Sequence, residues 1–206
     1  MSMDPQERRR LPSWWRYPVA LVAILACAAG GAFYAYRSVR LGASLGAFVH
    51  NGAWITDRTF ASATSTARTR AYLTVVGLLG LPRSEAIYFI ADKTSNGKPI
   101  DSDGVYEVSG KSLPGRWWSL TLYGEDQFLM PNPHNRYSVR STALVPEPDG
   151  SFRIRIARVP QPGNWIPMGE GRNLSLLLRV YNPDPGLDNR LETVPLPSIR
   201  RVGDAR

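Results

Sequence analysis

A single uncharged stretch near the N-terminus places the firmest limit on how this chain can fold. Residues 17–36 (YPVALVAILACAAGGAFYAY) form a run of 20 residues without a charged side chain. A helix of that length spans the roughly 30 Å hydrocarbon core of a bilayer. Tryptophan and tyrosine residues flank both ends of the run, as they do at membrane interfaces. The stretch therefore predicts a transmembrane helix between a short N-terminal segment and a larger C-terminal domain.

The arginines around this helix predict its orientation. Four arginines precede it within residues 1–16, whereas Arg37 and Arg40 follow it. Because positively charged residues are retained on the cytoplasmic side of a membrane, this excess places the N-terminus in the cytoplasm and the larger domain outside it.

Three interpretations of the stretch remain open, and we favour the uncleaved signal anchor because it accounts for the full length and both aromatic flanks. A cleaved secretory signal would use Ala26-Cys27-Ala28 as its small-residue site. Alternatively, Ile24-Leu25-Ala26-Cys27 resembles a bacterial lipobox, in which Cys27 would be lipidated. Cys27 is the one cysteine of the chain, so an intrachain disulfide and a four-cysteine zinc site are excluded.

After Glu85 the hydrophobic pattern changes to a period of two, the period of a β-strand with one buried face. In residues 115–124, Trp118, Leu120 and Leu122 alternate with more polar neighbours. Strands that recur every 8–12 residues indicate an antiparallel β-sandwich or barrel. Such strands are predicted over residues 86–92, 105–110, 115–124, 127–131, 136–145, 151–159 and 173–182.

A helix that packs on this domain is predicted over residues 67–79, where apolar residues recur on one face and Gly80 ends the pattern. The fold class is therefore mainly β, with one or two packed helices and a preceding transmembrane helix. The predicted organisation is a basic cytoplasmic segment (1–16), a signal anchor (17–36), a juxtamembrane connector (37–65), the exported β-domain (66–202) and a tail (203–206).

No recognised catalytic signature occurs in the sequence. The nucleophile elbow, the phosphate-binding loop, the dinucleotide fingerprint and the zinc-protease motif are all missing. The two histidines, His50 and His134, are too far apart in sequence to indicate a metal site, and Asp101-Ser102-Asp103-Gly104 is better explained as a polar hairpin turn than as a calcium loop. We therefore expect no cofactor and no metal.

The chain is basic, with a formal net charge of +8, but apart from Arg8-Arg9-Arg10 and Arg200-Arg201, both near the termini, its bases are scattered among acids. Nucleic-acid-binding proteins usually concentrate their bases on one segment. We therefore expect no nucleic-acid partner, and the basic charge leaves an acidic glycan, an anionic lipid or a protein as the partner.

Aromatic and polar residues cluster at the predicted strand ends, in RWWSLTLY (116–123), NPHNRYS (132–138), GNW (163–165) and LRVYNP (178–183). Tryptophan and tyrosine beside arginine and asparagine suit a cleft that stacks sugars or binds carboxylates. The same residues also lock the corners of a small sandwich, and this structural role remains the alternative. The candidate binding residues are Arg116, Trp117, Asn132, Arg136, Tyr137, Asn164 and Trp165.

These clusters also carry a family resemblance. The segments GRWWSLTLYGEDQFLMPNPHNRYSV and PQPGNWIPMGEGRNLSLLLRVYNPDP, followed by VPLPSIRRV, resemble the bacterial "domain of unknown function 1214" family over about residues 50–202. The resemblance implies a jelly-roll-like β-sandwich in the cell envelope and no established reaction. It also makes the membrane a bacterial inner membrane and the exported side the periplasm.

Two classes of function are consistent with these features. The first is a non-catalytic, membrane-anchored periplasmic module that binds a glycan, a lipid headgroup or a protein, or serves as an accessory subunit of a membrane complex. The second is a carbohydrate-active enzyme with paired carboxylates. The carboxylates available for it are Glu85, Glu107, Glu125, Asp126 and Glu170, none of which lies in a recognised motif.

Overall fold

The computed structural model describes residues 13–40, 48–59, 65, 70 and 80–205. The chain divides into an N-terminal unit, Met1–Ala43, and a C-terminal unit, Ser44–Arg206, and each is described by itself. The helix predicted over residues 67–79 lies, apart from Arg70, outside the described residues.

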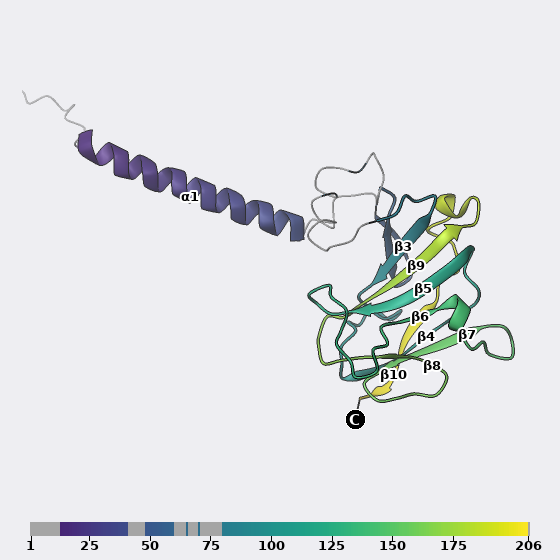
Figure 1. The fold of residues 1–206 in the computed structure, drawn as a ribbon. Coiled ribbons are helices and arrows are strands. Elements are labelled where there is room, and N and C mark those ends of the chain that lie inside the picture. Colours follow the sequence, from purple (N-terminus) through teal and green to yellow (C-terminus); the bar gives the residue numbers. More distant parts are fainter. Residues whose placement is uncertain (1–12, 41–47, 60–64, 66–69, 71–79, 206) are drawn as a thin grey trace, which may run out of the picture. The chain divides into compact units, whose positions relative to one another are not determined.

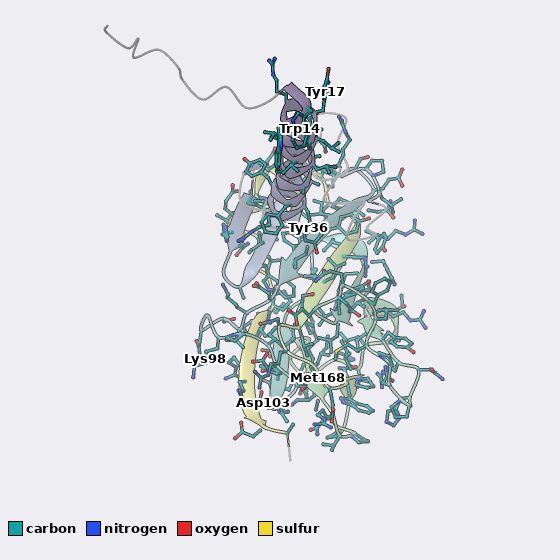
Figure 2. The ribbon with its side chains drawn as sticks, turned by 90° about the vertical axis from the view of Figure 1, so that its left-hand side faces the viewer. Trp14, Tyr17, Tyr36, Lys98, Asp103 and Met168 are labelled. Carbon is teal, nitrogen blue, oxygen red and sulfur yellow. The ribbon has the colours of Figure 1, made fainter. Side chains whose placement is uncertain are left out.

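The N-terminal unit contains one long helix, α1 (Ser13–Arg40). Its portion from Trp14 to Arg37, 24 residues, is long and apolar enough to cross a membrane, as a signal sequence near the N-terminus also is. At about 1.5 Å per residue this portion is roughly 36 Å long, which exceeds the hydrocarbon thickness of a bilayer. Trp14 and Tyr17 lie at one end of the helix and Tyr36 lies near the other (Figure 2), and their side chains are exposed.

The C-terminal unit contains two β-sheets (Figure 1). The larger sheet has six strands in the order β1-β2-β3-β9-β5-β6, and every neighbouring pair is antiparallel. Its strands are β1 (Phe48–Asn51), β2 (Trp54–Asp57), β3 (Ala86–Ala91), β5 (Gly115–Tyr123), β6 (Ser138–Arg140) and β9 (Ser175–Pro183).

The smaller sheet has four strands in the order β10-β4-β7-β8. Its β4–β10 and β4–β7 pairs are antiparallel, whereas β7 and β8 are parallel. Its strands are β4 (Gly104–Gly110), β7 (Phe152–Ala157), β8 (Asn164–Pro167) and β10 (Ser198–Asp204). Two short 3₁₀ helices complete the described unit, η2 (Ser141–Ala143) and η3 (Leu187–Asn189).

One hydrophobic core lies between the two sheets. Phe89 and Leu178 of the larger sheet belong to the same buried cluster as Ile154 and Ile199 of the smaller sheet. The rings of Trp118 and Phe152 meet across this core, with their centroids 4.8 Å apart. Each fully buried aliphatic or phenylalanine side chain of this kind stabilises the fold by about 1.5–3 kcal/mol. The arrangement is sandwich-like and mainly β, as the sequence predicts.

The stretch from 37 to 65, assigned to a connector in the sequence analysis, contains strands β1 and β2. Their hairpin turns at Gly52, whose φ of +61° is in the left-handed region that favours glycine. Trp54 is buried, and its indole Nε1–H donates to the Pro197 carbonyl at 2.7 Å. This contact fastens the hairpin to the segment that precedes β10.

Of the predicted strands, one is absent and one is shorter than expected. Residues 127–131 form no named strand, because a turn with φ of +66° at Gln127 leaves Leu129 with an isolated bridge to Tyr123. In the stretch 136–145 only β6 is extended. It ends at Arg140 because the Ser141 Oγ accepts a hydrogen bond from the Trp118 N–H, after which η2 begins.

Candidate functional site

The face of the larger sheet that points away from the core carries aromatic and polar side chains, which we call the outer array. Alternation along each strand produces it, since Leu120 faces the core while its neighbours Ser119 and Thr121 face the opposite side. The outer array consists of Tyr88 and Ile90 of β3, Leu177, Arg179 and Tyr181 of β9, Trp117, Ser119, Thr121 and Tyr123 of β5, and Ser138 and Arg140 of β6. Tyr88, Leu177, Ser119 and Thr121 in it are buried, whereas Ser138 and Arg140 are exposed. Tyr88 and Leu177 form, with Ala86, a second hydrophobic cluster on this face.

Strand register aligns these side chains into rows. Arg179 lies opposite Tyr88 on one side and Ser119 on the other, and Ser119 in turn lies opposite Arg140. Side chains in directly opposite positions have Cβ atoms about 4.5–5.5 Å apart. The central row therefore contains Ser119 with one arginine on each side, and Tyr88 lies beyond Arg179.

Arg179 lies near the middle of the outer array and is half-buried. Its Nη1 donates to the Thr121 Oγ1 at 3.2 Å and its Nη2 to the Tyr123 Oη at 2.7 Å. Its Cζ also lies 5.7 Å from the centroid of the Tyr123 ring, within the range of a cation–π contact. Among the residues that the structure describes, no carboxylate forms an ion pair with Arg179 or Arg140. Within the described part of the chain, the Arg179 guanidinium is therefore contacted by hydroxyls and an aromatic ring and by no negative charge.

Trp117 and Tyr181 form the aromatic part of the outer array. Their ring centroids are 4.8 Å apart at an interplanar angle of 55°, and both side chains are half-buried. The Trp117 Nε1–H donates to the Thr142 Oγ1 of η2 at 3.4 Å. Burial raises the pKa of the Tyr181 phenol, an effect that the positive charge of Arg179 opposes. The two rings thus form an apolar platform beside a cation.

The remaining predicted binding residues lie elsewhere. Arg116 precedes Trp117 by one position and is exposed at the start of β5, so it points away from the outer array. Asn132 orders a loop: its side-chain Nδ2 donates to the Met130 and Arg136 carbonyls, and its Oδ1 accepts the His134 and Arg136 N–H groups. Arg136 itself is exposed on that loop.

Tyr137 follows on the same loop and is half-buried, and its hydroxyl donates to the Asn135 Oδ1 at 3.5 Å. The His134 ring of this loop meets the Trp165 ring edge-on, with the centroids 4.9 Å apart. The fold therefore brings the segments 132–137 and 163–165 together, as one cluster separate from Trp117.

Asn164 and Trp165 of β8 are both buried. The Asn164 side chain accepts the Val145 N–H at 2.8 Å and donates to the Val145 and Arg153 carbonyls at 2.8 and 3.0 Å. The Trp165 Nε1–H donates to the Ala157 carbonyl at 3.0 Å. These bonds occupy the polar atoms of both side chains with backbone partners. Cys27, the alternative lipidation residue, is exposed on α1.

The carboxylates considered for catalysis are dispersed over the fold. Glu85 is exposed before β3, and Glu170 pairs with Arg158 at 2.6 Å. Asp126 accepts the Phe128 N–H within a turn, and the neighbouring Glu125 accepts a hydrogen bond from the Asn173 side chain. Glu107 lies on the smaller sheet and is surrounded by arginines. Within the described ranges, no group of three or more His, Cys, Asp or Glu residues could hold a metal ion.

Sequence reasoning included Arg179 and Tyr181 in the cluster 178–183 without selecting them as binding residues, and it missed Arg140. The alternation in β9 already separates Arg179 and Tyr181 from the core residues Leu178 and Val180, so this face was detectable. Its neighbours were not, because the register that aligns β9 with β3, β5 and β6 is set by pairing over long sequence separations.

Comparison with known proteins identifies the domain that carries the outer array. Residues 85–185, which contain β3 to β9, match the family model described as "Protein of unknown function (DUF1214)". This segment belongs to the DUF1214 family. The resemblance predicted from the sequence is thereby confirmed. A comparison with curated proteins gives no match.

Two solved structures resemble this chain. The VPA0106 protein from Vibrio parahaemolyticus is 26% identical with a TM-score of 0.55, and the match covers 66% of this chain and 35% of that one. An uncharacterized protein from Burkholderia cenocepacia is 20% identical with a TM-score of 0.46, and the match covers 86% of this chain and 43% of that one. Each match thus spans less than half the length of the solved structure that it matches.

Proposed function

We propose that this DUF1214 protein is a membrane-anchored periplasmic module that binds an acidic saccharide of the bacterial envelope at its outer array. In this proposal α1 holds the chain in the inner membrane, with the N-terminus in the cytoplasm and the β-domain in the periplasm. The apolar length of α1 supports an anchor, and the arginine excess on its N-terminal side supports this orientation.

The observation that carries the proposal is the half-buried Arg179, which has hydroxyl and aromatic contacts and no carboxylate partner among the described residues. Charged groups that are partly removed from water are normally paired. A ligand carboxylate would complete that pairing with a charge-assisted hydrogen bond. Arg140, in the same row, adds a second positive charge to attract the same group.

The aromatic rings beside Arg179 favour a saccharide as the ligand. Trp117 and Tyr181 present aromatic surface beside Arg179, and such rings combine an apolar face with a polar edge. Exposed hydroxyls of Ser138 and the phenol of Tyr181 lie on the same face and can bond to sugar hydroxyls. A ring that carries both hydroxyls and a carboxylate, as a uronic acid does, matches this combination of groups.

The experiment that tests the proposal is a binding measurement on the full chain in detergent micelles, with uronic-acid oligosaccharides and their neutral counterparts as probes. We expect saturable binding of the acidic probes alone. Replacing Arg179 with Gln removes the cation and keeps a hydrogen-bonding side chain, so it should weaken binding by about ten-fold or more, because bonds to charged groups contribute about 1.5–3 kcal/mol.

Matched variants control for nonspecific effects. Arg172→Gln is the control for Arg179→Gln, since it removes the same charge from an exposed position outside the outer array. A further variant, Trp117→Ala, removes a ring of the outer array. Its control is Phe128→Ala, which removes an exposed ring outside the array. Both controls should bind like the wild type. Equal binding of neutral and acidic probes, or full binding by Arg179→Gln, would contradict the proposal. Stoichiometric subunits that co-purify in place of any saccharide would favour the accessory-subunit alternative.

The anchor is tested separately by the mass of the intact chain from its native membrane and by a phosphatase fused after residue 206. A full-length mass and an active phosphatase support an uncleaved anchor with a periplasmic domain. A chain that begins at a lipidated Cys27 would establish the lipoprotein alternative.

A further inference from the structure

The smaller sheet carries a second concentration of charge on the face that points away from the core. Core residues Tyr106 and Val108 flank Glu107 in β4, so Glu107 faces outward. Register places Arg200 of β10 directly opposite Glu107 on one side and Arg155 of β7 opposite it on the other. The sheet thus forms a row of arginine, glutamate and arginine, which continues to Trp165 of β8.

Three guanidinium groups converge on the Glu107 carboxylate. The Arg200 Nη2 donates to Oε1 at 2.6 Å, and the Arg155 Nη2 lies 2.9 Å from Oε2. The Nε of Arg153, from the adjacent row of β7, lies 3.4 Å from the same Oε2. Arg153 also approaches the Glu147 carboxylate at 3.8 Å. We call Arg153, Arg155, Arg200 and Glu107 the arginine cluster.

The burial of these side chains is unequal. Glu107 is only 5% exposed although it lies on the outer face, because the arginines cover it. Arg153 and Arg200 are 50% and 59% exposed, and Arg155 is 28% exposed. Glu107 therefore offsets the mutual repulsion of three guanidinium groups whose outer N–H donors face solvent.

Charge balance shows that this arrangement exceeds what Glu107 requires. Two arginines already pair with both oxygens of Glu107. The third adds a positive charge, so the cluster carries a surplus of one even when Glu147 is counted. Each guanidinium has five N–H donors in a planar fork that matches the oxygens of a phosphate. Ser109 and Ser198 lie in the same row as Arg153, with their hydroxyl oxygens 3.1 Å apart. They add hydroxyl donors beside the guanidinium groups.

We propose that the arginine cluster binds a phosphate group, with Glu107 acting as the positioning residue that holds the three guanidinium groups together. The phosphate oxygens accept hydrogen bonds from the exposed edges of Arg153 and Arg200, over the solvent side of Glu107. The site lies on the smaller sheet, on strands that do not contribute to the outer array. Phosphate binding here is therefore independent of saccharide binding at the outer array. The phosphate comes from a soluble compound or from an anionic lipid headgroup, and the test separates these two sources.

The test is equilibrium dialysis of radiolabelled inorganic phosphate against the full chain in nanodiscs of phosphatidylcholine at low ionic strength. We expect saturable binding of one equivalent. The Arg200→Gln and Arg153→Gln variants should each weaken it by about ten-fold or more. Arg153→Gln removes the longest contact to Glu107 and therefore leaves the sheet folded, which circular dichroism verifies. The matched control is Arg58→Gln, whose arginine is 42% exposed and pairs with Glu192 outside the cluster.

A second arm repeats the dialysis in nanodiscs that contain an anionic phospholipid. Loss of labelled phosphate binding in these discs identifies a lipid headgroup as the occupant, whereas unchanged binding identifies a soluble phosphate compound. The proposal is overturned if wild type shows no saturable binding in the neutral discs, or if the folded Arg153→Gln and Arg200→Gln variants bind as tightly as the Arg58→Gln control.

Discussion

The three hydrogen bonds of Asn164 lead to a prediction that separates a structural role from a binding role for this residue. Asn164 is 6% exposed, and its side chain joins β8 to the Val145 backbone and to the Arg153 carbonyl of β7. Replacing it with Ala leaves one N–H and two carbonyl groups without these partners. At about 1 kcal/mol for each bond, the free energy of unfolding should fall by about 3 kcal/mol.

The loss is measurable by urea unfolding of the full chain in detergent micelles, followed by circular dichroism. A loss of about 3 kcal/mol corresponds to a melting temperature lower by roughly 6–12 °C for a domain of this size. Asn164→Asp retains an acceptor for the Val145 N–H but places a carboxylate against two carbonyl oxygens, so it should be at least as destabilising. Asn189→Ala, at an exposed position on η3, is the control and should change stability by less than about 0.5 kcal/mol.

A loss below about 1 kcal/mol in Asn164→Ala, at an unchanged dependence on urea concentration, would refute this reasoning. It would show that the Asn164 side chain is not committed to the backbone and is available to a ligand.

Three further predictions concern the smaller sheet. Burial raises the pKa of the Tyr106 phenol above its ordinary value of 10.0. The stability that the neutral phenol contributes is therefore complete below pH 10 and is lost as the pH rises through the higher pKa of the folded state. The phenolate absorbance and the free energy of unfolding should change together over this alkaline range. Gly104→Ala would place a Cβ 2.6 Å from the Tyr106 hydroxyl and should lower the melting temperature, unlike Gly203→Ala, whose Cβ would lie at an ordinary contact distance of 3.8 Å from the Val105 Cβ. Glu107→Gln should cost about 2 kcal/mol in urea unfolding, since it removes the charge that three guanidinium groups share but leaves them access to water; an unchanged stability would show that the arginines do not depend on it.

Most of the long strands were predictable from the sequence because their alternation runs over six or more residues. The seven-residue strand β10 was not predicted, since Ile199 alone is buried in it and its sequence shows no alternation. Strands β3, β4, β5, β7 and β9 match predicted segments closely, and in β5 the residues expected to face the core, Trp118, Leu120 and Leu122, are buried in it. The four-residue strands β1, β2 and β8 were missed, since so short a segment shows too few alternations to be distinguished from a loop. The parallel pairing of β7 with β8 also has no local signal.

The charge pattern shows most clearly what sequence reasoning cannot reach. Apart from Arg200-Arg201, the bases beyond residue 50 are scattered in the sequence, and this scatter argued against a nucleic-acid partner. Pairing of β4 with β7 and β10 nevertheless gathers Arg153, Arg155 and Arg200 around Glu107. A concentration of charge built by register between distant strands is invisible to a scan for charge runs. The same holds for Arg179 and Arg140 in the outer array.

Strand β10 has a practical consequence for how this protein can be shortened or tagged. It is the outermost strand of the smaller sheet, and its Ile199 is fully buried in the core. Removal of residues 198–204 would expose both that core and the unpaired N–H and C=O groups of β4, which are a template for pairing with another chain. The intact strand carries two consecutive arginines and a register shift between Arg201 and Gly203, features that discourage such pairing. A truncated chain that ends just before Ser198 should therefore aggregate, whereas the chain with β10 intact should not.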